Sequence, residues 1–237
     1  MSVFPSGRWQ LGWHARSLSA WRGIVHAERV GVRAELPGFV THYHLPGRPP
    51  FLSLSELDDA QLAAVLADLR ALRQDGKQHR PFGSRYMELR RRTETRLLEM
   101  FTAAGGRPQR PAPHYFVLGG SSWLQGLAED MECVRLPLSA LPPAQTSFTY
   151  PDSFTAIGSG APHGVGHQRR PYHGRVFLLH ELPGLVEQFG IPDPRWNGQQ
   201  QTWTTWPAEA YIEVQLWTDE PIEAYLPGQR QASQAGL

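Results

Sequence analysis

The order of its local patterns constrains this chain most, because helical periodicity dominates the first half and short strand-like segments dominate the second. Apolar residues at helical spacing predict helices over 55–75, capped by Ser55, and over 84–104. Shorter helices are expected at 122–130 and 183–189. Aromatic and β-branched segments bounded by Pro or Gly predict strands at 39–45, 115–118, 134–138, 147–150, 175–179 and 211–217.

This order of elements selects a fold class. A doubly wound parallel sheet requires regular alternation of strands and helices, which the chain lacks. We therefore predict an α+β fold with helices mostly N-terminal and a bent or split, mostly antiparallel sheet that is mostly C-terminal. With 237 residues and no repeat or long linker, one domain over 1–227 is expected, followed by a disordered tail at 228–237.

Composition and missing motifs exclude several functional classes. A net charge of +1 argues against general polyanion binding, and no apolar stretch is long enough to span a membrane. The one cysteine, Cys133, excludes a cysteine-based zinc site and favours a cytoplasmic location. Because the sequence lacks the GxGxxG, GxxxxGK[ST], HExxH and GxSxG patterns, Rossmann enzymes, P-loop enzymes, zincins and α/β-hydrolases are not expected.

The segment 211–217 carries the strongest functional signal. Alternation along a strand places Ile212, Val214 and Leu216 on one face, which is expected to be core. The other face carries Tyr211, Glu213, Gln215 and Trp217. A carboxylate and an amide between two large aromatics suit a small-molecule cleft, although a strand face that simply meets solvent explains the same pattern.

Two further segments carry polar groups that suit a site. His42 and His44 lie two residues apart on a predicted strand, which is half of a familiar metal site. A third ligand would have to come from elsewhere, for example His173, His180 or Glu213, and we expect no metal. Asp152 follows the strand at 147–150 in a Pro-Asp turn, where it is expected to cap its own backbone.

The second helix is predicted to carry a basic face. Arg90, Arg91, Arg92 and Arg96 lie around its expected exposed side. Such a face binds nucleic acid or the phosphates of a nucleotide, or it is an ordinary solvated face in which Glu94 pairs with Arg90 and Glu99 pairs with Arg96.

Three of these segments together resemble the ADP-ribosyltransferase-like superfamily. The shared features are a His-containing strand near the start, Tyr115 on a mid-chain strand, and Glu213 on a late strand that continues to Pro221-Ile222. The late segment is also similar to the closing strand of bacterial DNA-targeting members. This chain places Glu213 before Gln215, whereas the usual order in the superfamily is Q-x-E or E-x-E.

The resemblance implies NAD bound in a cleft between two small sheets. Glu213 would then stabilise the positive charge that develops as nicotinamide leaves, and Tyr115 would stack on the nicotinamide ring. His42 or His44 would hold ribose hydroxyls, and Arg85 or Arg110 would neutralise the pyrophosphate. Gln215 and Tyr211 would complete the cofactor-binding face.

The sequence thus favours an NAD-consuming enzyme that transfers ADP-ribose to an acceptor the sequence does not identify. A non-catalytic binding module is one alternative, in which Trp203, Trp206, Trp217 and Tyr211 would form an open aromatic surface. A His-coordinated metal enzyme is another.

Overall fold

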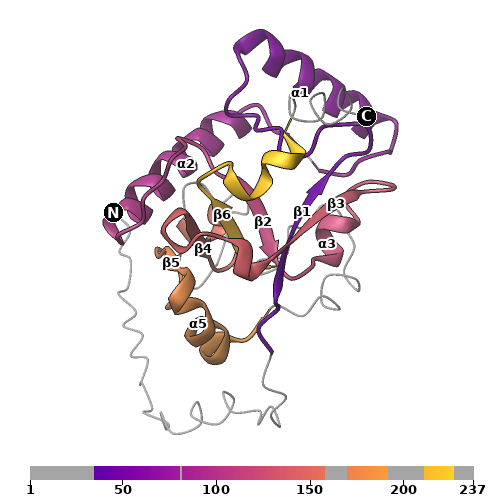
Figure 1. Cartoon of the computed structure of the whole chain (residues 1–237). Helices are drawn as coiled ribbons and strands as arrows, with labels where there is room; N and C mark the ends of the chain where they lie inside the picture. Colours follow the sequence, from indigo (N-terminus) through magenta and orange to yellow (C-terminus); the bar gives the residue numbers. More distant parts are fainter. Residues whose placement is uncertain (1–34, 81, 158–169, 192–210, 227–237) are drawn as a thin grey trace, which may run out of the picture. The chain divides into compact units, whose positions relative to one another are not determined.

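The computed structural model describes residues 35–80, 82–157, 170–191 and 211–226. These residues form a single α+β domain with a six-stranded sheet in which every strand pair is antiparallel (Figure 1), which confirms the predicted fold class. Residues 1–34 and the expected tail at 228–237 lie outside the described residues, so the boundaries at 1–227 stay a prediction.

The sheet has the strand order β3-β1-β2-β6-β4-β5. The late strand that carries Glu213 is therefore an interior strand, between β2 and β4. The bounds of the strands are β1 Phe39–His44, β2 His114–Leu118, β3 Glu132–Pro137, β4 Thr146–Thr149, β5 Phe177–Leu178 and β6 Glu213–Leu216. Each predicted strand segment overlaps one of these strands, but the one at 175–179 is reduced to two residues.

The pairing of β1 changes along its length. All of β1 pairs with β3, from Phe39 opposite Pro137 to His44 opposite Glu132. Its register with β2 covers only Val40 opposite Leu118 and Thr41 opposite Val117. Beyond Thr41 the contact between the two strands is made by a side chain, because His42 Nδ1 donates a hydrogen bond to the Tyr115 carbonyl at 2.8 Å. The two strands therefore separate within the sheet.

Two long helices fall within their predicted ranges, α1 at Asp59–Gln74 and α2 at Tyr86–Ala103. The predicted cap of the first was wrong. Asp58 caps α1, since the Gln61 amide donates to Asp58 Oδ1 at 2.7 Å in a capping box. Ser55 instead accepts a hydrogen bond from Arg90 Nε at 3.1 Å.

The remaining helices are short. They are α3 at Ser122–Gln125, α4 at Ser153–Ile157 and α5 at Leu182–Phe189. The first is shorter than the predicted 122–130, and α4 was not predicted as a helix. Asp152 does cap its own backbone as expected, because its carboxylate accepts from the amide and the hydroxyl of Thr155 at 3.2 and 2.7 Å.

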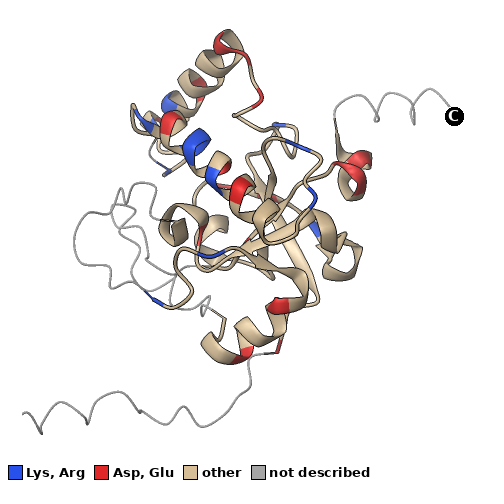
Figure 2. Cartoon of the chain, turned by 90° about the vertical axis from the view of Figure 1, so that its left-hand side faces the viewer, with Lys and Arg blue, Asp and Glu red and all other residues tan. Residues whose placement is uncertain are grey.

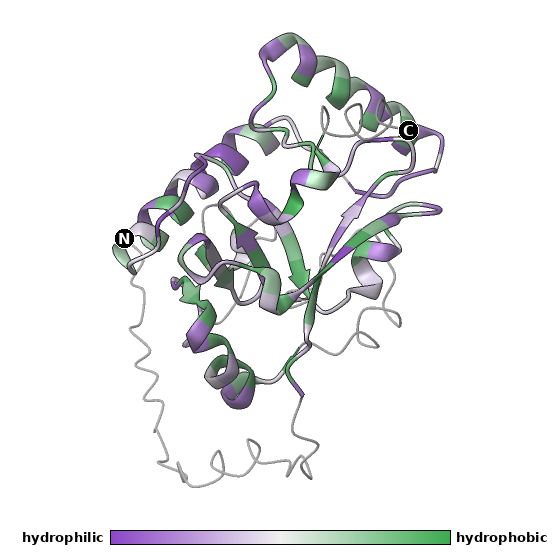
Figure 3. Ribbon diagram, in the orientation of Figure 1, coloured by the Kyte–Doolittle hydropathy of each residue, from purple (hydrophilic) through white to green (hydrophobic). Residues whose placement is uncertain are grey.

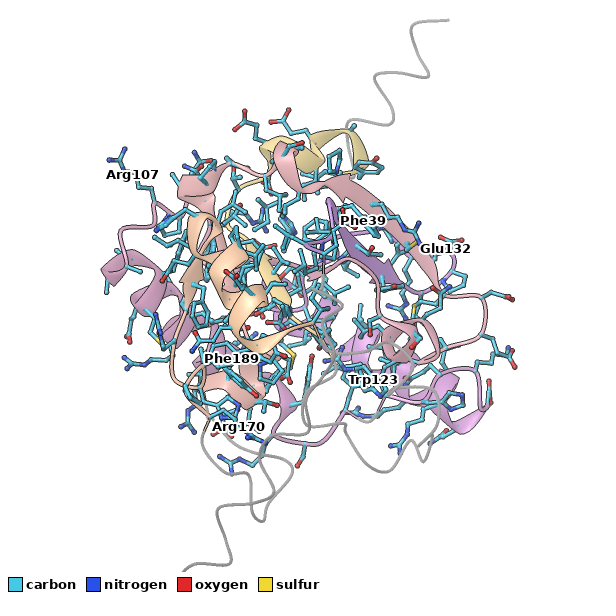
Figure 4. All side chains as sticks on the ribbon, turned by 90° about the horizontal axis from the view of Figure 1, so that it is seen from below. Phe39, Arg107, Trp123, Glu132, Arg170 and Phe189 are labelled. Carbon is cyan, nitrogen blue, oxygen red and sulfur yellow. The ribbon has the colours of Figure 1, made fainter. Side chains whose placement is uncertain are left out.

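The sheet is covered on both faces. On one face Ile212, Val214 and Leu216 are buried in the main core, as predicted, together with residues of β1, β2, β4 and α5. On the other face, Leu97 and Phe101 of α2 pack against Trp217. The rings of Phe101 and Trp217 stack with their centroids 5.8 Å apart. Figure 3 shows β2 as mostly hydrophobic and β6 as partly hydrophilic, and Figure 4 shows the side chain of Arg107 extending outward.

Burial on both faces rules out a solvent-facing polar side for β6. Gln215 and Trp217 are 0% exposed, and Tyr211 and Glu213 are buried with them. Among the helices of the described residues, none is long and apolar enough to cross a membrane.

The packing of α2 against the sheet yields a stability test with a matched pair of glycines. A Cβ at Gly106 would overlap the fully buried Phe101 ring, so Gly106→Ala is expected to lower the free energy of unfolding by about 1–3 kcal/mol. Gly184 in α5 has open space at the Cβ position, so Gly184→Ala is expected to raise it by about 0.5 kcal/mol. Urea denaturation measures both, and an equal effect of the two substitutions would contradict this description of the packing.

Candidate functional site

A pocket of about 240 Å³ lies where β1 and β2 separate. Its walls come from β1, β2 and β6, from the start of α2, and from the segments around residues 51–54, 80–82 and 152–154. The polar or aromatic residues that line it are Thr41, His42, Tyr43, Phe51, Ser53, Arg80, Phe82, Tyr86, Arg90, His114, Tyr115, Phe116, Asp152, Ser153, Phe154, Tyr211 and Glu213. Four predicted site residues, Glu213, Tyr115, His42 and Tyr211, are among them.

Glu213 is held by a chain of buried hydrogen bonds across the sheet. Trp217 Nε1 donates to Ser147 Oγ at 2.9 Å, and Ser147 Oγ donates to Gln215 Oε1 at 2.8 Å. The Gln215 amide then donates to Glu213 Oε1 and to Thr149 Oγ1, both at 3.0 Å. Gln215 was predicted to contact the cofactor, but it does not line the pocket and instead positions the Glu213 carboxyl.

The environment of Glu213 favours its protonated form. Burial raises the pKa of Glu213 to about 7, and the Asp152 carboxylate adds to this shift. Hydrogen bonds from Ser153 and Gln215 and the charge of Arg90 act in the opposite direction. Two carboxyl groups therefore share the pocket, one of which gains or loses its proton near neutral pH. Such perturbed groups are typical of functional sites.

A cationic group lies beside these carboxyls. The Arg90 guanidinium stacks on the Tyr115 ring, 4.8 Å from its centroid, and Arg90 Nε lies 2.9 Å from Glu94 Oε1. Tyr115 donates its hydroxyl proton to the same Glu94 oxygen at 3.1 Å. Burial, with the negative charge of Glu94, raises the pKa of Tyr115 well above its usual value, so this phenol stays protonated.

Tyr86 joins Arg90 to a second arginine. Its hydroxyl oxygen accepts from Arg90 Nη1 at 3.2 Å and from Arg80 Nη2 at 3.3 Å. Burial would raise the pKa of Tyr86, but the two positive charges lower it below the usual value. The pocket thus contains two guanidinium groups together with two carboxyl groups.

His42 approaches from the opposite face of the sheet. It lies two residues after Val40 on β1, so its side chain is on the same face of the sheet as the buried Val40 side chain. The centroid of its ring lies 4.2 Å from that of Phe51 and 5.7 Å from that of Phe116. Its Nδ1 donates to the Tyr115 carbonyl, and its Nε2 accepts from the Phe51 amide at 3.0 Å. Burial lowers the pKa of His42 to about 4, so the ring is neutral. Both nitrogens are engaged, and His42 serves to position the backbone around the pocket.

The remaining predicted site residues lie away from this pocket. His44 is near Glu132, 3.6 Å between Nδ1 and Oε2, in a second hollow. Arg85 is on the surface, where it pairs with Glu88 at 2.7 Å. Arg110 bridges Glu56 and Asp219. These three residues were chosen by their place in the sequence, which does not show where their side chains converge.

The predicted basic face of α2 divides into two parts. Arg90 is not exposed, since its side chain turns toward Tyr115 and retains 14% exposure. Arg91, Arg92 and Arg96 are exposed. The predicted pairs Arg90 with Glu94 and Arg96 with Glu99 both form, and acidic residues accompany the basic ones along the helix (Figure 2).

Sequence reasoning missed several residues that line the pocket. Arg80 lies before α2, Tyr86 is its first residue, and Ser153 follows β4. The sequence did mark the segment of Asp152, as polar residues after a strand and before a glycine-rich stretch, but it assigned Asp152 a capping role only. Nothing in the spacing of Arg80 and Tyr86 indicated that the Tyr86 hydroxyl would accept hydrogen bonds from both Arg80 and Arg90.

The described residues hold no group of three or more His, Cys, Asp or Glu side chains able to bind a metal ion. The ring centroids of His42 and His44 lie 6.1 Å apart. Because both nitrogens of His42 already bond to the backbone, the H-x-H motif does not form a metal site with His42 in this conformation.

Comparison of this chain with protein-family models, with curated proteins and with solved structures found no match.

The raised pKa of Glu213 makes stability depend on pH. The native carboxyl binds a proton up to about pH 7, whereas an unfolded glutamate releases it near pH 4.5. Between these values the native state binds more protons, so the free energy of unfolding falls as pH rises. Glu213→Gln removes the group whose deprotonation lowers the stability. The variant is therefore expected to have a free energy of unfolding about 1–3 kcal/mol above that of wild type at pH 8 but not at pH 4.5. Thermal denaturation across this range measures the difference, with the exposed Glu223→Gln as control.

A difference between Glu213→Gln and wild type that stays constant with pH would contradict the protonation of Glu213 in the native state. The same conclusion would follow if Glu223→Gln reproduced the effect.

Proposed function

We propose that this protein cleaves NAD at the bond between nicotinamide and ribose and transfers the ADP-ribose group to an acceptor. The proposal is carried by one observation: Glu213, Tyr115 and His42, which lie on three different strands and suggested the superfamily resemblance, all line one pocket.

The carboxyl pair suits this chemistry. When the C–N bond breaks, both bonding electrons leave with the nicotinamide ring, which loses its positive charge, and the ribose carbon becomes an oxocarbenium-like cation. A preorganised carboxylate stabilises such a charge most in a water-poor site. Glu213 and Asp152 destabilise one another as anions, and a cation between them relieves that repulsion. The acceptor then attacks the ribose carbon, and its proton passes to one of the two carboxylates.

The arginines in the pocket supply the anion-binding function that the resemblance implied for Arg85 or Arg110. Arg80 and Arg90 line the pocket, and guanidinium groups bind phosphate oxygens in pairs of hydrogen bonds. The volume of about 240 Å³ is below the range of about 300–1,000 Å³ for pockets that enclose a drug-sized ligand. The pocket therefore takes the nicotinamide-ribose end, and the adenosine end lies outside it.

The two alternatives find less support in the described residues. An open aromatic surface would need Trp217 and Tyr211 to be exposed, and both are buried, while Trp203 and Trp206 lie outside the described residues. A metal enzyme would need free ring nitrogens on His42 and His44, and those of His42 are engaged.

We assign the reaction to the cytoplasm, where an exposed unpaired thiol such as that of Cys133 stays reduced.

The test of this proposal separates binding from cleavage. NAD at about 100 times its dissociation constant should stabilise the wild-type protein by about 2.7 kcal/mol in a thermal-shift assay. Glu213→Gln should keep this stabilisation but release nicotinamide at least about 100-fold more slowly, because the stabilising charge is gone. Glu223→Gln is the control and should match wild type in both assays.

Wild-type protein that neither binds NAD at millimolar concentration nor releases nicotinamide would overturn the transferase assignment. Cleavage that persists in Glu213→Gln would overturn the role of Glu213 alone.

We further propose nucleic acid as an acceptor held by the exposed face of α2. Arg91, Arg92 and Arg96 are exposed on it, although Glu88 and Glu99 neutralise part of their charge. Replacing all three arginines by Gln should weaken retention of single- or double-stranded DNA or RNA and flatten its dependence on salt, since fewer counterions are released. Filter binding at several salt concentrations measures this, with nicotinamide release as the control for an intact pocket. A wild-type protein that retains no nucleic acid at low salt would remove this acceptor.

A further inference from the structure

The segment 51–55 crosses the pocket and is fixed at both ends. At one end the Phe51 amide donates to His42 Nε2 at 3.0 Å, and at the other the Ser55 hydroxyl accepts from Arg90 Nε at 3.1 Å. Residues 51 to 54 between these bonds all line the pocket. The segment therefore connects the aromatic wall of the pocket at His42 to the cationic side at Arg90.

The backbone of this segment is strained where it enters the pocket. Phe51 has a φ of 62°, in the left-handed region that large side chains rarely adopt. It persists because the ring packs among His42, Phe116, His114 and Tyr225. Strain of this kind is retained mainly where the surroundings impose it, and it is concentrated at functional sites.

Ser53 carries a buried hydroxyl that the described residues leave without a partner. The residue is 8% exposed, and its Oγ meets no donor or acceptor within hydrogen-bond distance. A buried hydroxyl without a partner has lost its hydrogen bonds to water and gained none in return, so such a group is unusual in a native structure. Here it stands on a segment fixed at both ends and in the wall of the candidate site.

We propose that Ser53 is a ligand-binding residue of this pocket and hydrogen-bonds an uncharged polar group next to an aromatic ring of the bound nucleotide. This assignment rests on the proposed NAD function. A hydroxyl can both donate and accept a hydrogen bond, so it matches the carboxamide of nicotinamide or a ribose hydroxyl, each of which offers donors and acceptors. Phe51 and Phe116 also line the pocket and make this wall aromatic and apolar.

Thr93 provides a matched control in the same protein. Its Oγ1 is also buried and unpartnered, at 1% exposure, but it lies on α2 and does not line the pocket. Ser53→Ala and Thr93→Val each remove one such hydroxyl and keep the side-chain shape. Neither is expected to lower the melting temperature, because no hydrogen bond within the protein is lost.

The experiment is titration calorimetry of wild type and both variants with NAD and, separately, with ADP-ribose. Ser53→Ala should bind NAD about tenfold more weakly than wild type, while Thr93→Val binds it equally well. A loss for NAD alone assigns Ser53 to the carboxamide, since ADP-ribose lacks nicotinamide. A loss for both ligands assigns it to a ribose hydroxyl.

Three results would overturn the inference. Equal NAD affinity in Ser53→Ala and Thr93→Val removes Ser53 from the site and leaves the transferase proposal intact. A melting temperature several degrees lower in Ser53→Ala than in Thr93→Val shows that the hydroxyl has a partner within the protein. Wild-type protein that binds no NAD overturns both this inference and the proposed function.

Discussion

The burial of polar groups on the central strand β6 is the constraint on which the rest of the structure depends. Glu213 and Gln215 lie on an interior strand that is covered on both faces, where each polar atom needs a partner. The hydrogen bonds that run from Trp217 through Ser147 to Gln215 meet this need and end at Glu213. The network fixes the carboxyl in place, and its other end, Trp217, is held by the packing of α2.

The pocket exists because β1 leaves β2 after two residue pairs. A sheet that continued its ladder would have closed this space with backbone hydrogen bonds. His42 instead bonds the Tyr115 carbonyl with one nitrogen and the Phe51 amide with the other, which keeps the strands apart and carries the segment 51–54 over the opening. Its low pKa follows from the same burial, and a charged ring would be unable to accept from Phe51.

The charges in the pocket are organised around Arg90. Its guanidinium contacts Glu94 and Tyr86 on the same helix, stacks on Tyr115 of β2 and opposes the rise in the pKa of Glu213 on β6, so one cation connects α2 with two strands of the site. Paired carboxyl and guanidinium groups in a partly closed space suit a ligand that is itself both cationic and anionic. The nicotinamide nucleotide of the proposed reaction has this character, because its pyridinium ring is positive and its phosphates are negative.

The sequence by itself determined the fold class, because the apolar spacing at 59–74 and 86–103 and the alternation at 212–216 are local properties that a helix and a strand each require. It also singled out Glu213, Tyr115 and His42. Tertiary structure alone decided that Arg90 turns into the pocket whereas Arg85 and Arg110 do not, and that Asp152 faces Glu213. The reason is physical: such convergence depends on strand order and on where β1 separates from β2, and these long-range contacts leave no periodic trace along the chain.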